Sequence, residues 1–184
     1  MVIFQNFLYM FISILDSSVL VLIVTIKTLL FSPFVMNGQS MEPNYHDGQY
    51  LITEKLTKNF DRWNVVIISP WIDTYRPYYL KRIVWLPWET IRFSSGQVEI
   101  KELGMSDFLQ ISEPYLSNSN KWSTFLPEYI EEKEFLIPDD SYWVMGDNRQ
   151  NSADSRQCFQ NCFWKDISAH FIKKSQITWK ILSD

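Results

Sequence analysis

The stretch YYLKRIVWL, residues 78–86, is typical of a β-strand in a folded core. It is rich in aromatic and β-branched residues, and strand alternation places Lys81 on one face with Tyr79 and Ile83. Arg82 then lies on the opposite face. Further short apolar segments follow, separated by Gly, Pro, Asp and Asn: QYLITEKL, NVVIISPW, ETIRF, QVEI, SYWVMG and QITWKIL. The sequence therefore predicts a mainly β fold with an antiparallel β domain.

The N-terminal part of the chain has a different pattern, FLYMFISILDSSVLVLIVTIKTLLFSPF at residues 7–34. A helix over residues 8–26 would rise roughly 29 Å, about the thickness of the hydrocarbon layer of a bilayer. Asp16 and Lys27 are its only charges, and we expect them near opposite headgroup layers. No Lys or Arg precedes the apolar run and no small-x-small site follows it, which argues against a cleaved secretory signal. We predict a single uncleaved transmembrane helix, with a buried helix of a soluble domain as the alternative.

These patterns divide the chain into two parts. Residues 1–34 form an N-terminal segment that contains the anchor, and residues 35–184 form the β-rich domain. Within that domain, residues 103–140 or so are polar, interrupted by prolines and only weakly periodic. We expect this region to be a surface excursion.

Charge and composition argue against nucleic acid as a partner. The chain has 17 Lys and Arg against 21 Asp and Glu, which gives a net charge of −4, and its basic residues form no stripe. Aromatic residues make up 16% of the chain, which suits β-strands and a belt at a membrane interface. We therefore expect a lipid bilayer, and no nucleic acid, among the partners.

The stretch VMNGQSMEPNY, residues 35–45, follows directly on the apolar segment. It is either an ordinary turn or a loop that holds Ser40 as a nucleophile at a membrane surface. A catalytic serine needs a base within hydrogen-bond reach, and the two histidines, His46 and His170, lie in no context that marks them as bases. Lys81 is the other candidate, because a lysine between apolar neighbours on a core-facing strand is desolvated and becomes neutral. From alternation alone, a solvent-exposed Lys81 is the simpler interpretation.

Four separated blocks of sequence bear on this choice: PFVMNGQSMEPNY (33–45), DGQYLITEKL (47–56), YLKRIVWLPWETI (79–91) and YWVMGDNRQNSADSR (142–156). In content and order they resemble the motifs of the bacterial type I signal peptidases, or leader peptidases, which are serine proteases with a Ser/Lys dyad. Together with EPYL (113–116), they span most of the chain after residue 32. The run GDNRQNSADSR is long enough to be specific by itself.

The resemblance implies roles for individual residues. Ser40 matches the nucleophile and Lys81 the general base, while Ser152 matches a serine that hydrogen-bonds and orients the lysine amine. Charged residues that match ion pairs bracing the site are Asp147, Asp154, Arg82 and Arg156. The positions that match the lining of shallow pockets for small substrate side chains are Phe34, Met36, Tyr45, Tyr79 and Leu80.

The resemblance also implies a function and a location. It predicts a membrane-bound endopeptidase that removes N-terminal signal peptides from exported preproteins through an acyl-enzyme, without a metal or cofactor. The implied fold is an antiparallel β catalytic domain with a large apolar surface set against the outer face of the membrane. The N-terminus is expected in the cytoplasm and the catalytic domain outside it, at the cell membrane.

The two cysteines, Cys158 and Cys162, allow two interpretations. With His170 they could supply three zinc ligands, but Cys-x3-Cys with one distant His is a poor match to structural zinc spacing. In an extracytoplasmic domain a disulfide is favoured, although the short loop demands tight geometry.

Several positions depart from the pattern of the family. Gln49 stands where Asp is usual, and Trp85 and Trp88 replace the usual glycines, which implies a reshaped turn or aromatic anchors at the membrane interface. Gly38 lacks the hydroxyl with which some relatives hold the oxyanion. The backbone N–H of Ser40 is then the expected oxyanion donor.

Other functions remain possible at this stage. One is a dedicated processing peptidase of a conjugation or pilus system, with the same chemistry on a single substrate. A self-cleaving repressor of the LexA type shares the dyad, but the chain has a membrane segment and no room for a helix-turn-helix. The last alternative is an inactive membrane-anchored binding module, against which the joint presence of Ser40, Lys81 and Ser152 argues.

Overall fold

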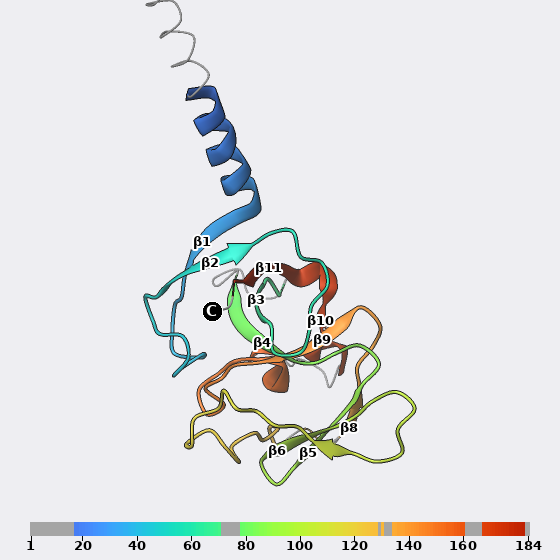
Figure 1. The fold of residues 1–184 in the computed structure, drawn as a ribbon. Helices are drawn as coiled ribbons and strands as arrows, with labels where there is room; N and C mark the ends of the chain where they lie inside the picture. The colour runs from blue at the N-terminus through green and yellow to red at the C-terminus, as the bar shows by residue number, and fades with distance from the viewer. Residues whose placement is uncertain (1–16, 71–77, 129, 131–133, 161–166, 183–184) are drawn as a thin grey trace, which may run out of the picture.

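The computed structural model describes residues 17–70, 78–128, 130, 134–160 and 167–182 (Figure 1). A helix over residues 17–30 leads directly into the first strand. The strands that follow are β1 (Phe31–Val35), β2 (Tyr50–Glu54), β3 (Val65–Ile68), β4 (Tyr79–Trp85), β5 (Thr90–Ser94), β6 (Gln97–Lys101), β7 (Leu109–Gln110), β8 (Glu134–Leu136), β9 (Ser141–Met145), β10 (Ile172–Lys173) and β11 (Ile177–Ile181). Short 3₁₀ helices are η1 (Ser155–Gln160), η2 (Ile167–His170) and η3 (Lys174–Gln176).

The described strands form two sheets. The larger has seven strands in the order β1-β2-β11-β3-β4-β9-β10, and the smaller has four in the order β7-β6-β5-β8. Every strand pairing within them is antiparallel. The prediction of a mainly β, antiparallel fold is therefore confirmed.

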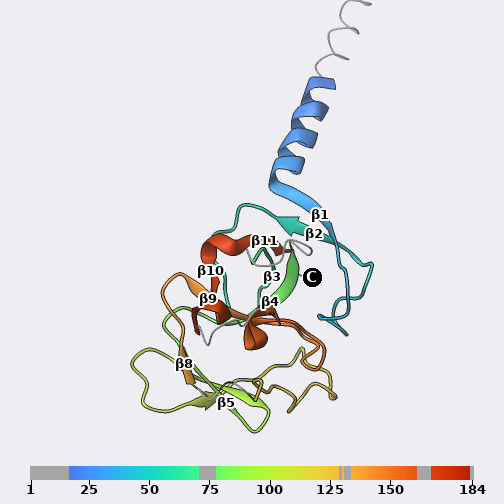
Figure 2. The same cartoon turned by 180° about the vertical axis from the view of Figure 1, so that it is seen from behind.

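An aromatic core joins the two sheets. Trp85 from β4 and Trp143 from β9 are fully buried, and the rings of both contact Phe93 of β5 in a tilted geometry. The smaller sheet contributes the apolar residues of its inner face to the same cluster, namely Ile91, Phe93, Val98, Ile100 and Phe135. Figures 1 and 2 show β5 and β8 at the end of the molecule farthest from the helix. The smaller sheet therefore supports β4 and β9 from the side away from the helix.

The helix projects from the larger sheet with its side chains exposed over residues 17–29. Residues 8–16 of the expected transmembrane span lie outside the described residues. Across the described part of the chain, no helix has both the length and the apolar character needed to cross a bilayer. The last turn of the helix is attached to the residue that follows β2, since Nζ of Lys55 donates to O of Thr28 at 2.9 Å.

The region expected as a surface excursion, residues 103–140, contributes two short strands, β7 and β8, to the smaller sheet. Most of the remainder lacks regular structure, but Leu116, Asn120 and Thr124 within it are buried. These residues form part of the interior of the domain beside the smaller sheet.

The two tryptophans in the place of glycines have different environments. Trp85 is 0% exposed in the aromatic core, so its indole is not at a membrane interface. Trp88 is 48% exposed and has φ +70, a left-handed conformation that glycine adopts freely and tryptophan does not. The turn between β4 and β5 therefore keeps a glycine-like backbone at Trp88.

Candidate active site

The loop between β1 and β2, which we call the nucleophile loop (residues 36–49), carries Ser40. Its ends are joined by two backbone hydrogen bonds, from Met36 N to Gln49 O at 2.9 Å and from Gly48 N to Met36 O at 2.8 Å. Gly38 has φ +91, and its N–H donates to Oδ1 of Asp47 at 2.7 Å. Ser40 is half-buried within this closed loop.

Lys81 is buried in β4 and contacts Ser40. Its backbone pairs with Val66 in β3, and its side chain is 1% exposed. Nζ donates hydrogen bonds to Oγ of Ser40 at 2.8 Å and to the carbonyl oxygen of Leu80 at 2.9 Å. Two residues far apart in sequence are thus in direct hydrogen-bond contact, and the solvent-exposed interpretation of Lys81 is wrong.

The environment of Lys81 makes the neutral amine easier to form than in a free lysine. Burial lowers the pKa of the amine from 10.5 to about 8, against the opposing effect of the carboxylates of Asp154 and Asp147. The nearby guanidinium of Arg156 lowers it further. A 2.8 Å contact with a hydroxyl is the distance that a general base needs to accept its proton.

Ser40 and Lys81 lie in the wall of a cleft of about 520 Å³. Four of the five expected pocket residues line this cleft, namely Phe34, Met36, Tyr79 and Leu80. The fifth, Tyr45, packs against a core cluster that includes Met36 and Leu80 and is not among the lining residues. Asn151 and Ala153 complete the cleft next to the dyad, together with residues of the nucleophile loop.

Comparison with known proteins identifies the family. Residues 10–181 match the family model described as signal peptidase, peptidase S26. The chain is 37% identical over 142 residues to a signal peptidase I from Bacillus amyloliquefaciens, covering 74% of this chain and 71% of that protein. It is 34% identical over 141 residues to a signal peptidase I from Bacillus licheniformis, covering 74% and 72%. The chain belongs to the signal peptidase family S26.

This peptidase is accordingly a serine endopeptidase. A crystal structure of a signal peptidase I from Enterococcus faecalis also matches it, with a TM-score of 0.45 and 20% identity over 68% of this chain and 97% of that one.

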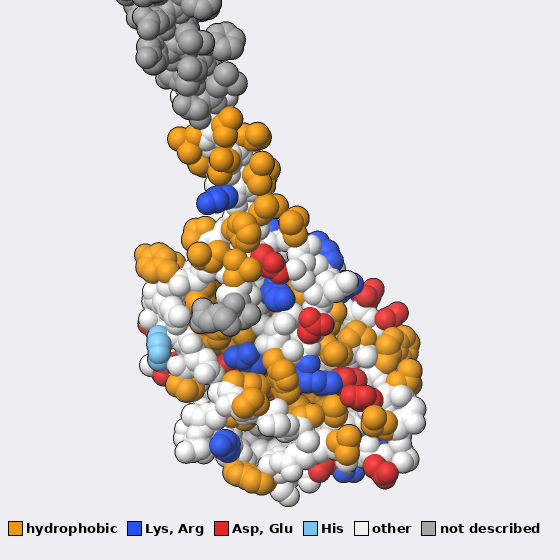
Figure 3. Space-filling view, viewed as in Figure 1, with side chains coloured by type: hydrophobic (Ala, Val, Ile, Leu, Met, Phe, Trp, Pro, Cys, Tyr) orange, Lys and Arg blue, Asp and Glu red, His pale blue; other side chains and the backbone are white. Residues whose placement is uncertain are grey.

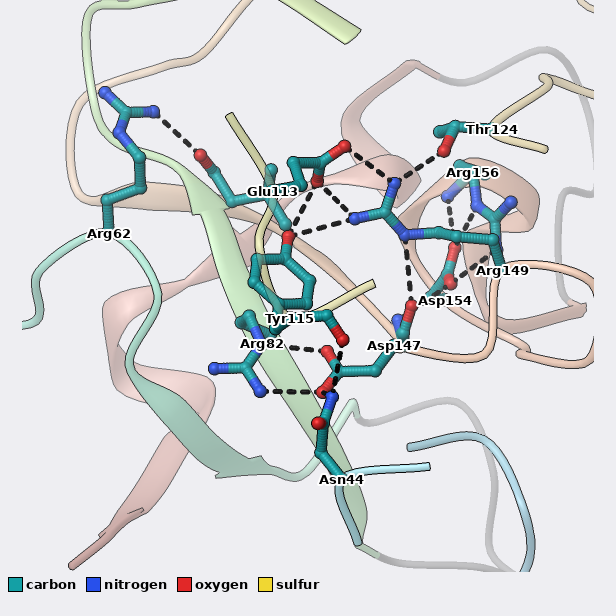
Figure 4. Close-up of polar contacts among 12 residues, drawn as sticks. Asn44, Arg62, Arg82, Glu113, Tyr115, Thr124, Asp147, Arg149, Asp154 and Arg156 are labelled. Carbon is teal, nitrogen blue, oxygen red and sulfur yellow. Dashed lines mark hydrogen bonds and ion pairs between the residues drawn. The ribbon is translucent and has the colours of Figure 1, made fainter. Parts of the chain in front are cut away.

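The expected charged residues of the peptidase form two ion pairs (Figure 4). Nε and Nη2 of Arg82 donate to the two carboxylate oxygens of Asp147 at 2.8 and 2.6 Å. Arg156 binds Asp154 in the same bidentate way, at 2.9 and 2.8 Å. The guanidinium of Arg156 lowers the pKa of Asp154 against the opposing effect of burial, so this carboxylate remains charged beside Lys81.

Ser152 lies near the dyad without the expected hydrogen bond to the amine. It is 8% exposed, and its hydroxyl has no hydrogen-bond partner within the described residues. A Cβ at Gly146 would lie 2.2 Å from Oγ of Ser152 and 2.4 Å from O of Ser40. Because Gly146 has no side chain, Ser152 and Ser40 can both pack against its backbone. The orienting role of Ser152 stays a prediction.

Residues to which the sequence assigned no role also contact the nucleophile loop or lie close to it. The backbone N–H of Asn148 donates to O of Ser40 at 3.0 Å, and its side-chain amide donates to O of Gln39 at 3.1 Å. A second buried cluster contains Arg149, Glu113, Tyr115 and Thr124. Except for Thr124, these residues stand in the blocks GDNRQNSADSR and EPYL, but no spacing rule links the blocks to each other.

The histidines and cysteines take no visible part in the dyad. The ring of His46 is exposed and donates no hydrogen bond to Ser40, whereas His170 is buried, stacks on Trp143 and hydrogen-bonds O of Ser155 through Nδ1 at 2.6 Å. Cys158 is disulfide-bonded, and Cys162 lies outside the described residues. Among the residues that are described, no three His, Cys, Asp or Glu side chains gather as metal ligands would.

Proposed function

We propose that this chain is a membrane-anchored signal peptidase that removes N-terminal signal peptides from exported preproteins with a Ser40/Lys81 dyad. The observation that carries the proposal is the 2.8 Å contact between Nζ of a buried lysine and Oγ of a serine in the wall of a cleft. The curated relatives from Bacillus amyloliquefaciens and Bacillus licheniformis are named signal peptidase I, which supports the substrate class.

The mechanism follows from the protonation state of the amine. Neutral Lys81 accepts the proton of Ser40, and Oγ attacks the carbonyl of the scissile bond. The amine then gives its proton to the leaving nitrogen, and an acyl-enzyme is left on Ser40. A water that the same amine deprotonates hydrolyses this ester and frees Oγ.

The oxyanion of the tetrahedral intermediate needs a donor next to Oγ. Within the described residues, the backbone N–H of Ser40 donates to no acceptor, and it adjoins the attacking atom. Gly38 offers no hydroxyl for this purpose. We assign the Ser40 N–H as the principal donor.

The walls of the cleft favour small substrate side chains. Phe34, Met36, Tyr79 and Leu80 fill the space beside the dyad, so that an alanine methyl fits where a leucine would displace packed side chains. Such displacement costs about 1–3 kcal/mol. We propose that substrates have small residues at the first and third positions before the cut.

Anchoring is part of the proposal. The side chains of the helix are exposed from Val19 to Leu29, and all of them are apolar except those of Thr25, Lys27 and Thr28. Figure 3 shows hydrophobic side chains along the helix and on the adjoining domain. The exposed apolar residues at that end of the domain are Phe31, Val35, Tyr50, Ile52 and Leu56. We propose that residues 1–34 anchor the peptidase with its N-terminus in the cytoplasm, and that residues 35–184 act outside it against the membrane.

The dyad is tested by Ser40→Ala and Lys81→Met, each of which should abolish cleavage of a preprotein with an Ala-x-Ala site. Lys81→Arg should also be inactive, because a guanidinium does not deprotonate in proteins. The measurement is cleavage by the purified full-length chain in detergent, with folding of each variant confirmed by circular dichroism. Turnover like that of the wild type in a folded Ser40→Ala or Lys81→Met variant would contradict the dyad.

A further inference from the structure

Asn44 lies in the same turn as Ser40, and its side-chain amide joins the nucleophile loop to two other parts of the molecule (Figure 4). Nδ2 donates to Oδ2 of Asp147 at 2.8 Å and to the carbonyl oxygen of Tyr115 at 2.9 Å. The amide nitrogen has two hydrogens, and both are used. The backbone N–H of Asn44 also closes the turn by donating to O of Met41 at 3.1 Å.

The first acceptor, Asp147, is fixed to the strand that carries the base. It is 0% exposed, and both of its oxygens accept hydrogen bonds from Arg82, which follows Lys81 in β4. Asn44 shares Oδ2 of Asp147 with Nη2 of Arg82. One buried carboxylate therefore connects the turn of the nucleophile to the strand of the base.

The second acceptor, Tyr115, is held in a buried cluster. The guanidinium of Arg82 lies 4.2 Å from the centre of its ring, and its hydroxyl accepts a hydrogen bond from Arg149 at 3.0 Å. Arg149 is 3% exposed and donates through Nε to the carbonyl oxygen of Gly146 at 3.2 Å. Because Gly146 lies against Ser40 and Ser152, this cluster also contacts the surroundings of the dyad.

We propose that Asn44 is a positioning residue, which holds the nucleophile loop so that Ser40 stays within hydrogen-bond reach of Lys81. The proposal rests on the function proposed above and adds a residue that acts through the loop without touching the substrate. It also gives the region of residues 113–124 a part in the site, because the backbone of Tyr115 supplies one of the two attachment points.

The chemistry of the two acceptors explains why an amide suits this position. One acceptor is a carboxylate and the other a backbone carbonyl, so both bonds require donors. A threonine hydroxyl has a single hydrogen and can serve only one of them, and an aspartate would place a second carboxylate against Asp147. Asparagine supplies two donors from one atom without adding charge.

The test compares Asn44→Ala, Asn44→Thr and the matched control His46→Ala in the full-length chain. His46 lies in the same loop, but its ring is exposed and forms no hydrogen bond that the structure describes. kcat and KM are measured with an Ala-x-Ala peptide at a temperature where circular dichroism shows every variant to be folded. Displacing a catalytic group by about 1 Å can lower a rate by about a hundredfold, so loss of both bonds should have a large effect on kcat.

We expect Asn44→Ala to lower kcat by at least about tenfold with KM within about twofold of the wild type. The kcat of Asn44→Thr should lie between those of Asn44→Ala and the wild type, and the kcat of His46→Ala should equal that of the wild type. A folded Asn44→Ala with unchanged kcat overturns the proposal; if that variant does not fold, wild-type kcat in Asn44→Thr overturns it. Absence of cleavage by the wild type would instead contradict the proposed function.

Discussion

The charge of Lys81 sets the pH at which the dyad works. Burial lowers the pKa of its amine to about 8, and only the neutral amine can accept the proton of Ser40. We therefore expect kcat/KM to rise tenfold per pH unit below pH 8 or so, and to level off above it. The measurement is the pH profile of peptide cleavage, with His46→Ala as a control that should leave the profile unchanged.

The same residue links stability to pH. The pKa of Lys81 is about 8 in the folded chain and 10.5 for an unperturbed lysine, so between these values the unfolded state binds more protons. The free energy of unfolding should therefore rise with pH across this window, by at most about 3.4 kcal/mol. Lys81→Met should lack this rise. In the pH profile of cleavage, an increase of the rate that follows the pKa of a histidine and is lost in His46→Ala would instead assign the base to His46.

The strands show what local sequence can predict. Each of the seven segments identified by their apolar and β-branched residues contains a strand, namely β2, β3, β4, β5, β6, β9 and β11. β7, β8 and β10 were not identified, because two or three residues are too few to show alternation. β1 follows the helix directly and has the same apolar character, so that nothing in its composition separates it from the apolar segment.

The turn from β4 to β5 has a backbone that its sequence does not suit. Trp88 has φ +70, and a non-glycine residue in this region is strained by about 1–2 kcal/mol. We expect Trp88→Gly to be more stable than Trp88→Ala by about 1 kcal/mol, the reverse of the usual preference for alanine. Both variants lose the same half-exposed indole, so their comparison isolates the backbone.

Urea denaturation of the two Trp88 variants measures this difference. Equal stability, or the ordinary advantage of alanine, would mean that the turn relaxes out of the left-handed conformation when the indole is removed.

The site is assembled from segments that are distant in sequence, and this limited what could be predicted. Resemblance singled out Ser40, Lys81 and the two ion-paired aspartates, and in the structure Ser40 contacts Lys81 while each aspartate pairs with an arginine. It gave no role to Asn44 or Arg149, because their hydrogen bonds cross from one block to another. Such contacts depend on how the two sheets pack around Trp85 and Trp143, which no local pattern encodes.

A contact of Lys55 fixes the helix to the domain that carries the cleft. Nζ of Lys55 donates to O of Thr28 in the last helical turn and lies 5.8 Å from the centre of the Trp179 ring. Trp179 stacks on Tyr78, with ring centres 6.0 Å apart, and Tyr78 lines the cleft. A lysine at this place also complements the negative end of the helix dipole. Lys55 thus connects the proposed anchor to the wall of the substrate cleft.

We expect Lys55→Met to separate two activities of the peptidase. Methionine keeps the apolar stem but cannot donate, so the helix should lose its fixed angle while the dyad stays intact. Cleavage of a soluble Ala-x-Ala peptide in detergent should stay within twofold or so of the wild type, whereas cleavage of a preprotein inserted in vesicles should fall by about fivefold, the equivalent of about 1 kcal/mol for one hydrogen bond. The control is Lys58→Met, at an exposed lysine with no hydrogen bond in the described structure. An equal loss in both assays would mean that Lys55 supports the dyad itself, and no loss in vesicles would mean that the angle of the helix does not govern delivery of the substrate.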